Sequence, residues 1–289
     1  MANNYLALLF KKKKVGDKLN IFGKDVIIGD FKLSDYGLMV GSFDFPYEDD
    51  EDLGMSHETI EEFIGHYPTP ISFGASYSSK LKPVMTIVKD KDMSDSMYFN
   101  SHECREVLRQ LTGFSGYKTM QIFPYNFDEL LYFNVRVVNV SYKKLDNSVV
   151  GIILEMECDS QFAWSEEFNY TYQVSPTNPL IVFNTSDDLY NYIYPLVKIK
   201  SVNDSDVMSI TNIEDNNWTT EITSLNKNEV ITMDSKREII SSSVPDRLIS
   251  NNFNMHFIRL KSGKNEFTFN NDAEITLSFR VPRKVGFVL

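Results

Sequence analysis

The chain has 289 residues, of which 42% are hydrophobic and 13% aromatic, so it has enough apolar mass for folded cores and is not intrinsically disordered. Its net charge of -11 argues against nucleic-acid binding through neutralised phosphates, which needs a basic surface. The length predicts two domains of ordinary size.

Neither a secretion signal nor a disulfide is expected. The apolar stretch Tyr5–Phe10 is too short for a signal peptide, and its lysines follow instead of preceding it. No stretch approaches the length of a membrane span, so we expect folding in a cytoplasm without membrane insertion. Cys104 and Cys158 lie on predicted apolar faces without metal-type spacing, which favours two buried free thiols.

The first third of the chain predicts short strands separated by turns. Asn20–Asp25 has the pattern of a hairpin turn, Val26–Ile28 follows as a strand, and Gly29–Asp30 ends that strand. Lys11–Lys14 is expected to be a solvated turn, with contact to an acidic neighbouring subunit as the alternative. The acidic run Glu48–Asp52 favours an open loop because its like charges repel.

A short helix is predicted next. Ser56 is a candidate N-cap, Ile60, Phe63 and Ile64 are its apolar residues, and Gly65 ends it.

A clearer helix is predicted over about His102–Leu111. Asn100 can cap it, Glu103 completes a capping box, and Gly113 ends it. One apolar stripe at helical spacing runs along it, formed by Cys104, Val107, Leu108 and Leu111.

Two long strands follow, joined by a polar hairpin connection over Lys143–Ser148. Asn134–Val140 is expected to place Val135, Val137 and Asn139 on one side. Val149–Cys158 alternates more clearly, with two faces made by Ile152, Leu154, Met156 and Cys158 against Ile153, Glu155 and Glu157.

The second half of the chain is strand-like throughout. The segment Phe162–Pro179 mixes aromatic and polar residues and is the best candidate boundary, which gives domains 1–165 and 166–289. Turns such as Ser262–Asn265 separate short β-type runs, so an antiparallel sandwich is predicted. These runs are Val207–Ile210, Val230–Met233, Met255–Leu260, Phe267–Phe269 and Ile275–Val281.

Enzyme and metal signatures are missing from the sequence. It has no glycine-rich phosphate loop, no G-x-S-x-G nucleophile turn, no H-E-x-x-H zinc motif and no paired C-x-x-C. The histidines His57, His66, His102 and His256 are scattered. We therefore expect no enzyme activity, no cofactor and no metal site.

One pair of carboxylates could still indicate an enzyme, because glycosidases use two carboxylates to cleave a sugar. Glu155 and Glu157 share a strand face at a spacing near the roughly 5–10 Å between glycosidase carboxylates. Phe162 and Trp164 lie nearby in sequence as possible sugar platforms. A strand face directed to solvent or to another subunit is favoured over catalysis. The linker residues Glu166 and Glu167 receive the same interpretation.

Two further features have competing interpretations. Five short polar residues are expected to lie in turns, where their side chains bond their own backbone, and calcium binding is the less favoured alternative. They are Asp204, Asp206, Asn270, Asn271 and Asp272. Trp218 is interpreted as a core residue, with an exposed carbohydrate platform as the alternative.

The order of these motifs resembles the phage distal tail (Dit) protein family, also called siphovirus tail component. The resemblance covers nearly the whole chain, although each motif is short and structural. It departs from the family's usual pattern at Glu48–Asp52 and in the tail Lys284–Leu289. In the first half it rests on Phe22–Asp25, the helix around His102–Leu111, and the hairpin of Tyr132–Val140 and Gly151–Cys158 with its exit Glu157–Trp164. In the second half it rests on Tyr194–Ile199, Ile210–Asn212, Glu229–Asp234, Leu260–Glu266 and Leu277–Arg283.

The resemblance implies a mainly β structural protein of a long-tailed phage, assembled in the host cytoplasm and located in the virion at the tail tip. Six copies would form a hub ring through which DNA passes without specific binding. The N-terminal domain, a ring-forming β-sandwich with one packed α-helix, would meet the tail tube. The C-terminal domain, a galectin-like or carbohydrate-module-like β-sandwich, would project outward. An acidic lumen would let DNA slide, and Glu48–Asp52 is one hypothesis for its lining.

The implied partners are the tail tube protein, the tail-tip hub or tail-lysin protein, the tape measure protein and a receptor-binding protein. Two alternatives remain open. One is a carbohydrate-binding adhesion module that uses Trp218, and the other is a tail-tip glycan hydrolase that uses Glu155 and Glu157.

Overall fold

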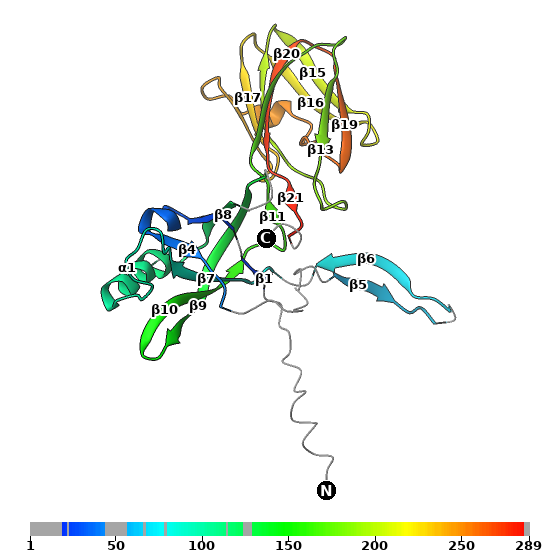
Figure 1. The fold of residues 1–289 in the computed structure, drawn as a ribbon. Coiled ribbons are helices and arrows are strands. Elements are labelled where there is room, and N and C mark those ends of the chain that lie inside the picture. The colour runs from blue at the N-terminus through cyan, green and yellow to red at the C-terminus, as the bar shows by residue number, and fades with distance from the viewer. Residues whose placement is uncertain are drawn as a thin grey trace. The chain divides into compact units, whose positions relative to one another are not determined.

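The computed structural model describes residues 19–21, 23–43, 57–65, 68–77, 80–113, 115–123 and 129–285. The expectations at Lys11–Lys14, Phe22, Glu48–Asp52, Ser56 and His66 lie outside these residues. The described chain forms two compact units (Figure 1). Residues through Ala163, together with the segment that begins at Lys284, form the first unit, and Trp164–Arg283 forms the second.

The first unit is built on a ten-stranded sheet with the strand order β1-β7-β10-β9-β8-β2-β3, and β4, β11 and β21 pair off this path. A short 3-10 helix, Leu33–Tyr36, follows β3. The strands of this sheet are β1 (Leu19–Asn20), β2 (Asp25–Ile28), β3 (Phe31–Lys32), β4 (Leu38–Val40), β7 (Pro83–Lys89), β8 (Lys118–Phe123), β9 (Leu131–Leu145), β10 (Ser148–Cys158), β11 (Ala163–Trp164) and β21 (Pro282–Arg283). Of these, β21 lies within the segment Trp164–Arg283 that is assigned to the second unit.

The predicted hairpin at Asn20–Asp25 is wrong. β1 pairs in parallel with β7, whereas β2 pairs with β3 and β8, so the strands on either side of this segment do not meet. A local turn signal could not reveal this, because the partner strands β7 and β8 are distant in sequence. The tight turn is instead Gly29–Asp30, where Gly29 adopts φ +61°, a conformation that residues with side chains rarely take.

The helix predicted at His102–Leu111 is confirmed as α1 (Ser101–Thr112). The side chain of Asn100 accepts hydrogen bonds from the backbone N–H groups of His102 and Glu103, at 3.0 and 2.9 Å. The carboxylate of Glu103 accepts from the backbone N–H of Asn100 at 2.8 Å, which completes the capping box. The apolar stripe of α1 packs into the core of the first unit.

The short helix predicted after Ser56 is wrong. The residues form strand β5 (His57–Glu62), which pairs antiparallel with β6 (Ile71–Tyr77) in a two-stranded sheet of their own. Ile60, Phe63 and Ile64 stand at i, i+3 and i+4, which is helical spacing, but three residues are too few to exclude a strand. The segment becomes a strand because it pairs with β6, whose residues Ile71–Tyr77 include the aromatic and β-branched types that strands favour.

The β9–β10 hairpin confirms the predicted faces of the second strand: Ile152, Leu154, Met156 and Cys158 are all buried. The strands extend into the predicted loop, so that only Asp146 and Asn147 remain as the turn. A bulge opposite Glu155 and Met156 shifts the alternation of β9. Asn139 is therefore exposed instead of sharing a side with Val135, and Val140 packs against the core.

Both predicted free thiols are confirmed. Cys104 from α1 and Cys158 from β10 are buried in one hydrophobic core and are not disulfide-bonded. That core also holds Val285, to which the chain returns after the second unit.

The second unit is a sandwich of two antiparallel sheets, as predicted. The five-stranded sheet has the order β12-β20-β14-β17-β18, and the four-stranded sheet has the order β13-β19-β15-β16. Inward-facing residues of both sheets share one core. The strands are β12 (Phe168–Val174), β13 (Leu180–Asn184), β14 (Leu196–Ser201), β15 (Ser205–Asn212), β16 (Trp218–Leu225), β17 (Val230–Asp234), β18 (Ile239–Ser242), β19 (Gly263–Phe269) and β20 (Ala273–Phe279).

Two segments of this unit differ from the sequence-based expectation. Met255–Leu260 is not a strand but a loop that buries Phe257, Ile258 and Leu260, so its apolar residues fill the core without pairing in a sheet. Phe162–Pro179 contains β12, which pairs with β20 along its whole length.

The two ends of the second unit are bonded to each other. The backbone N–H of Ser165 donates to the carbonyl of Val281 at 3.0 Å. The N–H of Val281 donates to the hydroxyl oxygen of Ser165 at 3.1 Å.

The mainly β fold class is confirmed, and α1 is the one α-helix of the described residues. The galectin-like character of the second unit, and the division into a ring-forming domain 1–165 and an outward-facing domain 166–289, stay predictions. None of the described helices is long and apolar enough to cross a membrane.

Candidate functional site

The β5–β6 hairpin exposes five apolar side chains, here called the hairpin surface: Ile60, Phe63, Ile64, Ile71 and Phe73. Phe63 and Phe73 are 74% and 61% exposed. No further strand joins β5 and β6 among the residues that the structure describes. Because an isolated two-stranded hairpin is marginally stable in water, and contiguous exposed apolar residues mark contact sites, this surface is suited to a protein partner.

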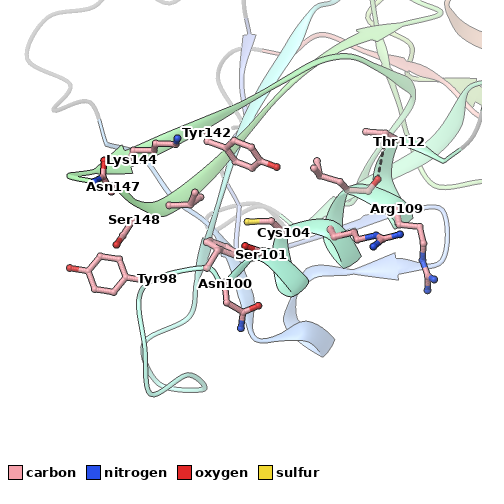
Figure 2. A pocket seen from close by; sticks show the side chains of 14 residues that line it. Tyr98, Asn100, Ser101, Cys104, Arg109, Thr112, Tyr142, Lys144, Asn147 and Ser148 are labelled. Atoms are coloured by element: carbon pink, nitrogen blue, oxygen red, sulfur yellow. Dashed lines mark hydrogen bonds between the residues drawn. The ribbon is translucent and has the colours of Figure 1, made fainter.

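A groove of about 830 Å³ lies in the first unit between α1 and the β9–β10 hairpin. Figure 2 shows side chains of α1 on one side, those of the hairpin opposite, and Tyr98 at one end. The helix contributes Ser101, Cys104, Arg105, Leu108, Arg109 and Thr112, the hairpin contributes Tyr142, Lys144, Asn147, Ser148 and Val149, and the loop before the helix contributes Tyr98, Phe99 and Asn100.

The groove is basic in an otherwise acidic chain. Its lining includes Arg105, Arg109 and Lys144 but no aspartate or glutamate. Arg109 pairs with Glu106 beside the groove at 2.9 Å. The groove also contains weakly acidic groups, and burial raises the pKa of both the Cys104 thiol and the Tyr142 hydroxyl. These two groups are therefore uncharged at neutral pH, and the basic side chains determine its charge.

An ion pair lies on the other side of α1. Lys89, only 8% exposed, places its Nζ 2.7 Å from a carboxylate oxygen of Glu103. Burial acts to raise the pKa of Glu103, but the hydrogen bonds from Lys89 and from the N–H of Asn100 outweigh it and lower that pKa. The pair fixes the start of α1 against β7.

On the face of β10 that carries the predicted carboxylates, Glu157 forms ion pairs with basic side chains. Glu157 accepts hydrogen bonds from Arg136 at 3.0 Å and from Lys80 at 3.4 Å. The Arg136 hydrogen bond is the main cause that lowers the pKa of Glu157. A glycosidase general acid needs a raised pKa, so Glu157 is poorly suited to that role.

The aromatic and acidic residues that follow this face in sequence differ in their surroundings. Phe162 is buried, at 4% exposed. The Nζ of Lys236 lies 5.9 Å from the Trp164 ring centroid. Glu166 and Glu167 are exposed.

Three of the short polar residues for which calcium binding is the alternative form hydrogen bonds at turns and strand ends. Asp204 accepts from the N–H of Lys227 at 2.8 Å, and Asn270 accepts from the N–H of Ser209 at 2.7 Å. Asn271 donates to the Ser205 hydroxyl at 2.8 Å. The side-chain partners of Asp204, Asn270 and Asn271 lie on other segments, and not on their own backbone as the turn interpretation predicts.

Trp218 begins β16 and is half-buried. Its indole Nε1–H donates to the carbonyl of Phe257 at 3.0 Å. The His256 ring stacks on it at a centroid distance of 4.2 Å, and the guanidinium carbon of Arg259 lies 3.8 Å from its centroid. A carbohydrate at Trp218 would have to share the ring with these groups, and this contact stays a prediction.

Arg259 connects Trp218 to a buried carboxylate. Its Nε donates to Asp215 at 2.7 Å, and Asp215 is 3% exposed. The hydroxyl of Tyr192 donates to the other Asp215 oxygen at 3.0 Å, a bond that raises the pKa of Tyr192. No sequence motif signalled this cluster, because its members come from three separate loops.

The groove had a partial signal in the sequence. Arg105 and Arg109 lie off the apolar stripe of α1, and Lys144 lies near the predicted hairpin connection. Only the packing of the hairpin beside the helix brings the three together.

Two family models match the chain. One is described as a phage tail protein N-terminal domain and matches residues 22–160. The other is described as a phage tail C-terminal domain and matches residues 162–279. No curated protein sequence matches the chain significantly.

Solved structures of phage tail proteins are also similar. The crystal structure of the Dit protein (gp 19.1) of phage SPP1, presented as a paradigm of the hub adsorption apparatus in phages infecting Gram-positive bacteria, has a TM-score of 0.61 at 12% identity. The match covers 89% of this chain and 98% of that one, so the two share a fold. A chain of the phage P2 baseplate in its activated conformation with Ca matches at 8% identity, covering 86% of this chain and 92% of that one, with a TM-score of 0.44.

Proposed function

Because this chain belongs to the phage tail protein family whose N- and C-terminal domains it contains, we propose that it is the subunit of a closed hub ring at the tail tip. The protein is a structural component of the phage tail and baseplate, of the distal tail type. The finer proposal is a ring of six copies around a channel for DNA.

The hairpin surface carries the proposal. In a closed ring every subunit contacts its neighbour through the same two patches, so a projecting apolar patch is covered on each copy. Fully burying a phenylalanine side chain contributes about 1.5–3 kcal/mol. Burying Phe63 and Phe73 would therefore favour the free energy of association at every contact between neighbouring subunits of the ring.

The charge of the chain supports the channel. A net charge of -11 lets DNA pass without adhering, because like charges repel along the wall. The proposed partners are the tail tube protein on one face of the ring, the tail-tip hub or tail-lysin protein with the tape measure protein on the other, and receptor-binding proteins at the second unit. The role is assembly and not catalysis, in keeping with the ion-paired state of Glu157.

Light scattering combined with analytical ultracentrifugation of the full chain tests the ring. We expect a defined species of six copies. The double variant Phe63→Glu with Phe73→Glu should dissociate it, since a buried charge at each contact opposes association. Leu248→Glu is a matched control, because Leu248 is 74% exposed, as Phe63 is, but belongs to the second unit and not to the hairpin surface. A strictly monomeric wild type at high concentration would refute the ring.

A further inference from the structure

The groove between α1 and the β9–β10 hairpin contains positive charge that the described chain does not neutralise. Neither Arg105 nor Lys144 has an ion-pair partner among the residues that the structure describes, and both are exposed. The two lie on opposite walls, with Arg105 on α1 and Lys144 on β9. Tyr98 and Tyr142 add exposed aromatic rings to the lining. The groove therefore offers an occupant both cations and apolar surface.

The β5–β6 hairpin carries the opposite charge. Glu61 and Glu62 are exposed and have no ion-pair partner in the part of the chain that the structure describes. Neither β5 nor β6 contains a lysine or an arginine. Apolar side chains of the hairpin surface lie beside these carboxylates, since Phe63 follows them directly and Ile71 pairs across from Glu62. The hairpin is therefore acidic and apolar at the same place.

We propose that the groove of one copy binds the β5–β6 hairpin of the next copy. The proposal rests on the closed ring proposed above, in which each head-to-tail contact joins two different surfaces of the same chain. The hairpin surface is one of them, and the groove would be the other. The chain's own hairpin does not fill its groove, because Phe63 is exposed and no residue of β5 or β6 lines it.

The two carboxylates of the hairpin suit the two walls of the groove. Glu61 and Glu62 are consecutive and both pair regularly with β6, so their side chains point to opposite faces of β5. A strand that enters the groove directs one face to each wall. One carboxylate would then meet Arg105 on α1 and the other Lys144 on β9. The groove volume of about 830 Å³ falls within the range of about 300–1,000 Å³ that is typical of binding sites.

Charge and apolar burial would have different roles in this contact. Exposed ion pairs contribute little to affinity, so the apolar residues of the hairpin surface would supply most of it. The charges would select the partner surface and its register. Copies that each carry a net charge of -11 repel one another at long range, so a local match of opposite charges is what brings the correct surfaces together.

Charge reversal in the full chain tests the contact. Arg105→Glu with Lys144→Glu makes the groove acidic, and Glu61→Lys with Glu62→Lys makes the hairpin basic. Each double variant alone should raise the midpoint concentration of assembly at least about tenfold, because like charges then meet at every contact. An equimolar mixture of the two variants should return it to within about threefold of the wild type, since each groove then meets a hairpin of opposite charge. Sedimentation velocity measures all of these midpoints.

Matched controls reverse the same number of charges outside the contact. They are Lys198→Glu with Lys200→Glu, and Glu166→Lys with Glu167→Lys, all at exposed positions of the second unit. Both controls should assemble as the wild type does, and recovery in the mixture shows that the test variants are folded. If the wild type assembles but the test variants assemble equally well, or their mixture does not recover, this proposal is overturned and the ring stands. A wild type that stays monomeric overturns both.

Zero-length carbodiimide cross-linking locates the contact. We expect an amide link between Lys144 and Glu61 or Glu62, identified by peptide mass mapping. The link should be lost in Lys144→Gln and retained in Lys143→Gln, since Lys143 contacts Phe43 instead of lining the groove. When ¹⁴N- and ¹⁵N-labelled chains are mixed equally before assembly, about half of the links should join peptides of different isotope, because neighbours in the ring are separate copies. Links within one isotope alone would overturn the contact between copies.

Discussion

The guanidinium carbon of Arg259 lies 3.8 Å from the centroid of the Trp218 ring, while its Nε donates to the buried Asp215 at 2.7 Å. One side chain therefore joins an aromatic ring at the start of β16 to a carboxylate in the preceding turn. The Tyr192 ring, 4.2 Å from the same guanidinium carbon, adds a third segment. The cluster fixes three loops at the same end of the sandwich.

We expect Arg259→Ala to destabilise the chain by about 3 kcal/mol, because it leaves the Asp215 carboxylate buried with only Tyr192 as a partner. Urea unfolding of the full chain, followed by tryptophan fluorescence, measures this. Lys261→Ala is the control, since the Lys261–Glu214 pair at 3.7 Å is partly exposed and is expected to contribute at most about 1 kcal/mol. An equal loss of unfolding free energy in Arg259→Ala and Lys261→Ala would contradict a buried ionic cluster.

Carbohydrate contact at Trp218 predicts glycan binding that Trp218→Ala abolishes. Trp164→Ala is the matched control, because it removes the other tryptophan of the chain. His256→Ala should strengthen binding, since it removes the ring that now stacks on Trp218. A glycan array probed with the full chain measures all three. Absence of binding by the wild type, or binding unchanged in Trp218→Ala, would leave Trp218 with a structural role alone.

The Lys89–Glu103 pair predicts a pH-dependent contribution to stability. The folded pKa of Glu103 is below its ordinary value of 4.5, so the contribution is fully present above that value and is lost as pH falls through the folded pKa. We expect Glu103→Gln to destabilise the chain by about 1 kcal/mol at pH 7 and by much less near pH 3. Urea unfolding at the two pH values measures this. If Glu103→Gln lowered the free energy of unfolding equally at both pH values, the result would contradict the ion pair.

The two thiols should differ in reactivity. Burial raises the pKa of both, and Cys158 is 1% exposed, whereas Cys104 is 8% exposed and lines the groove. We expect native iodoacetamide labelling to be slow at Cys104 and negligible at Cys158, because the thiolate is the reactive form. Mass spectrometry with and without urea measures both rates. Native labelling of Cys158 as fast as that of Cys104 would show that the core around β10 opens readily.

The sequence predicted elements whose determinants are local. Asn100 and Glu103 cap α1 from within three residues, and the apolar stripe of that helix repeats within three turns. The buried face of β10 is likewise set by alternation along a single strand. In both cases the local pattern and the final packing agree.

The sequence could not predict features that depend on distant partners. Ile60, Phe63 and Ile64 fit a helix until β6 pairs with their segment. The side on which Asn139 lies depends on a bulge opposite β10. The groove requires the hairpin to pack beside α1, and the Arg259 cluster requires three loops to converge, neither of which spacing along the chain encodes.

The bond between Ser165 and Val281 has an evolutionary consequence. The second unit begins and ends at adjacent points, so the core that contains Val285 can close across it with little rearrangement. A segment bounded in this way is suited to recombination as a cassette. Tails that keep the first unit can therefore exchange the second unit as a whole.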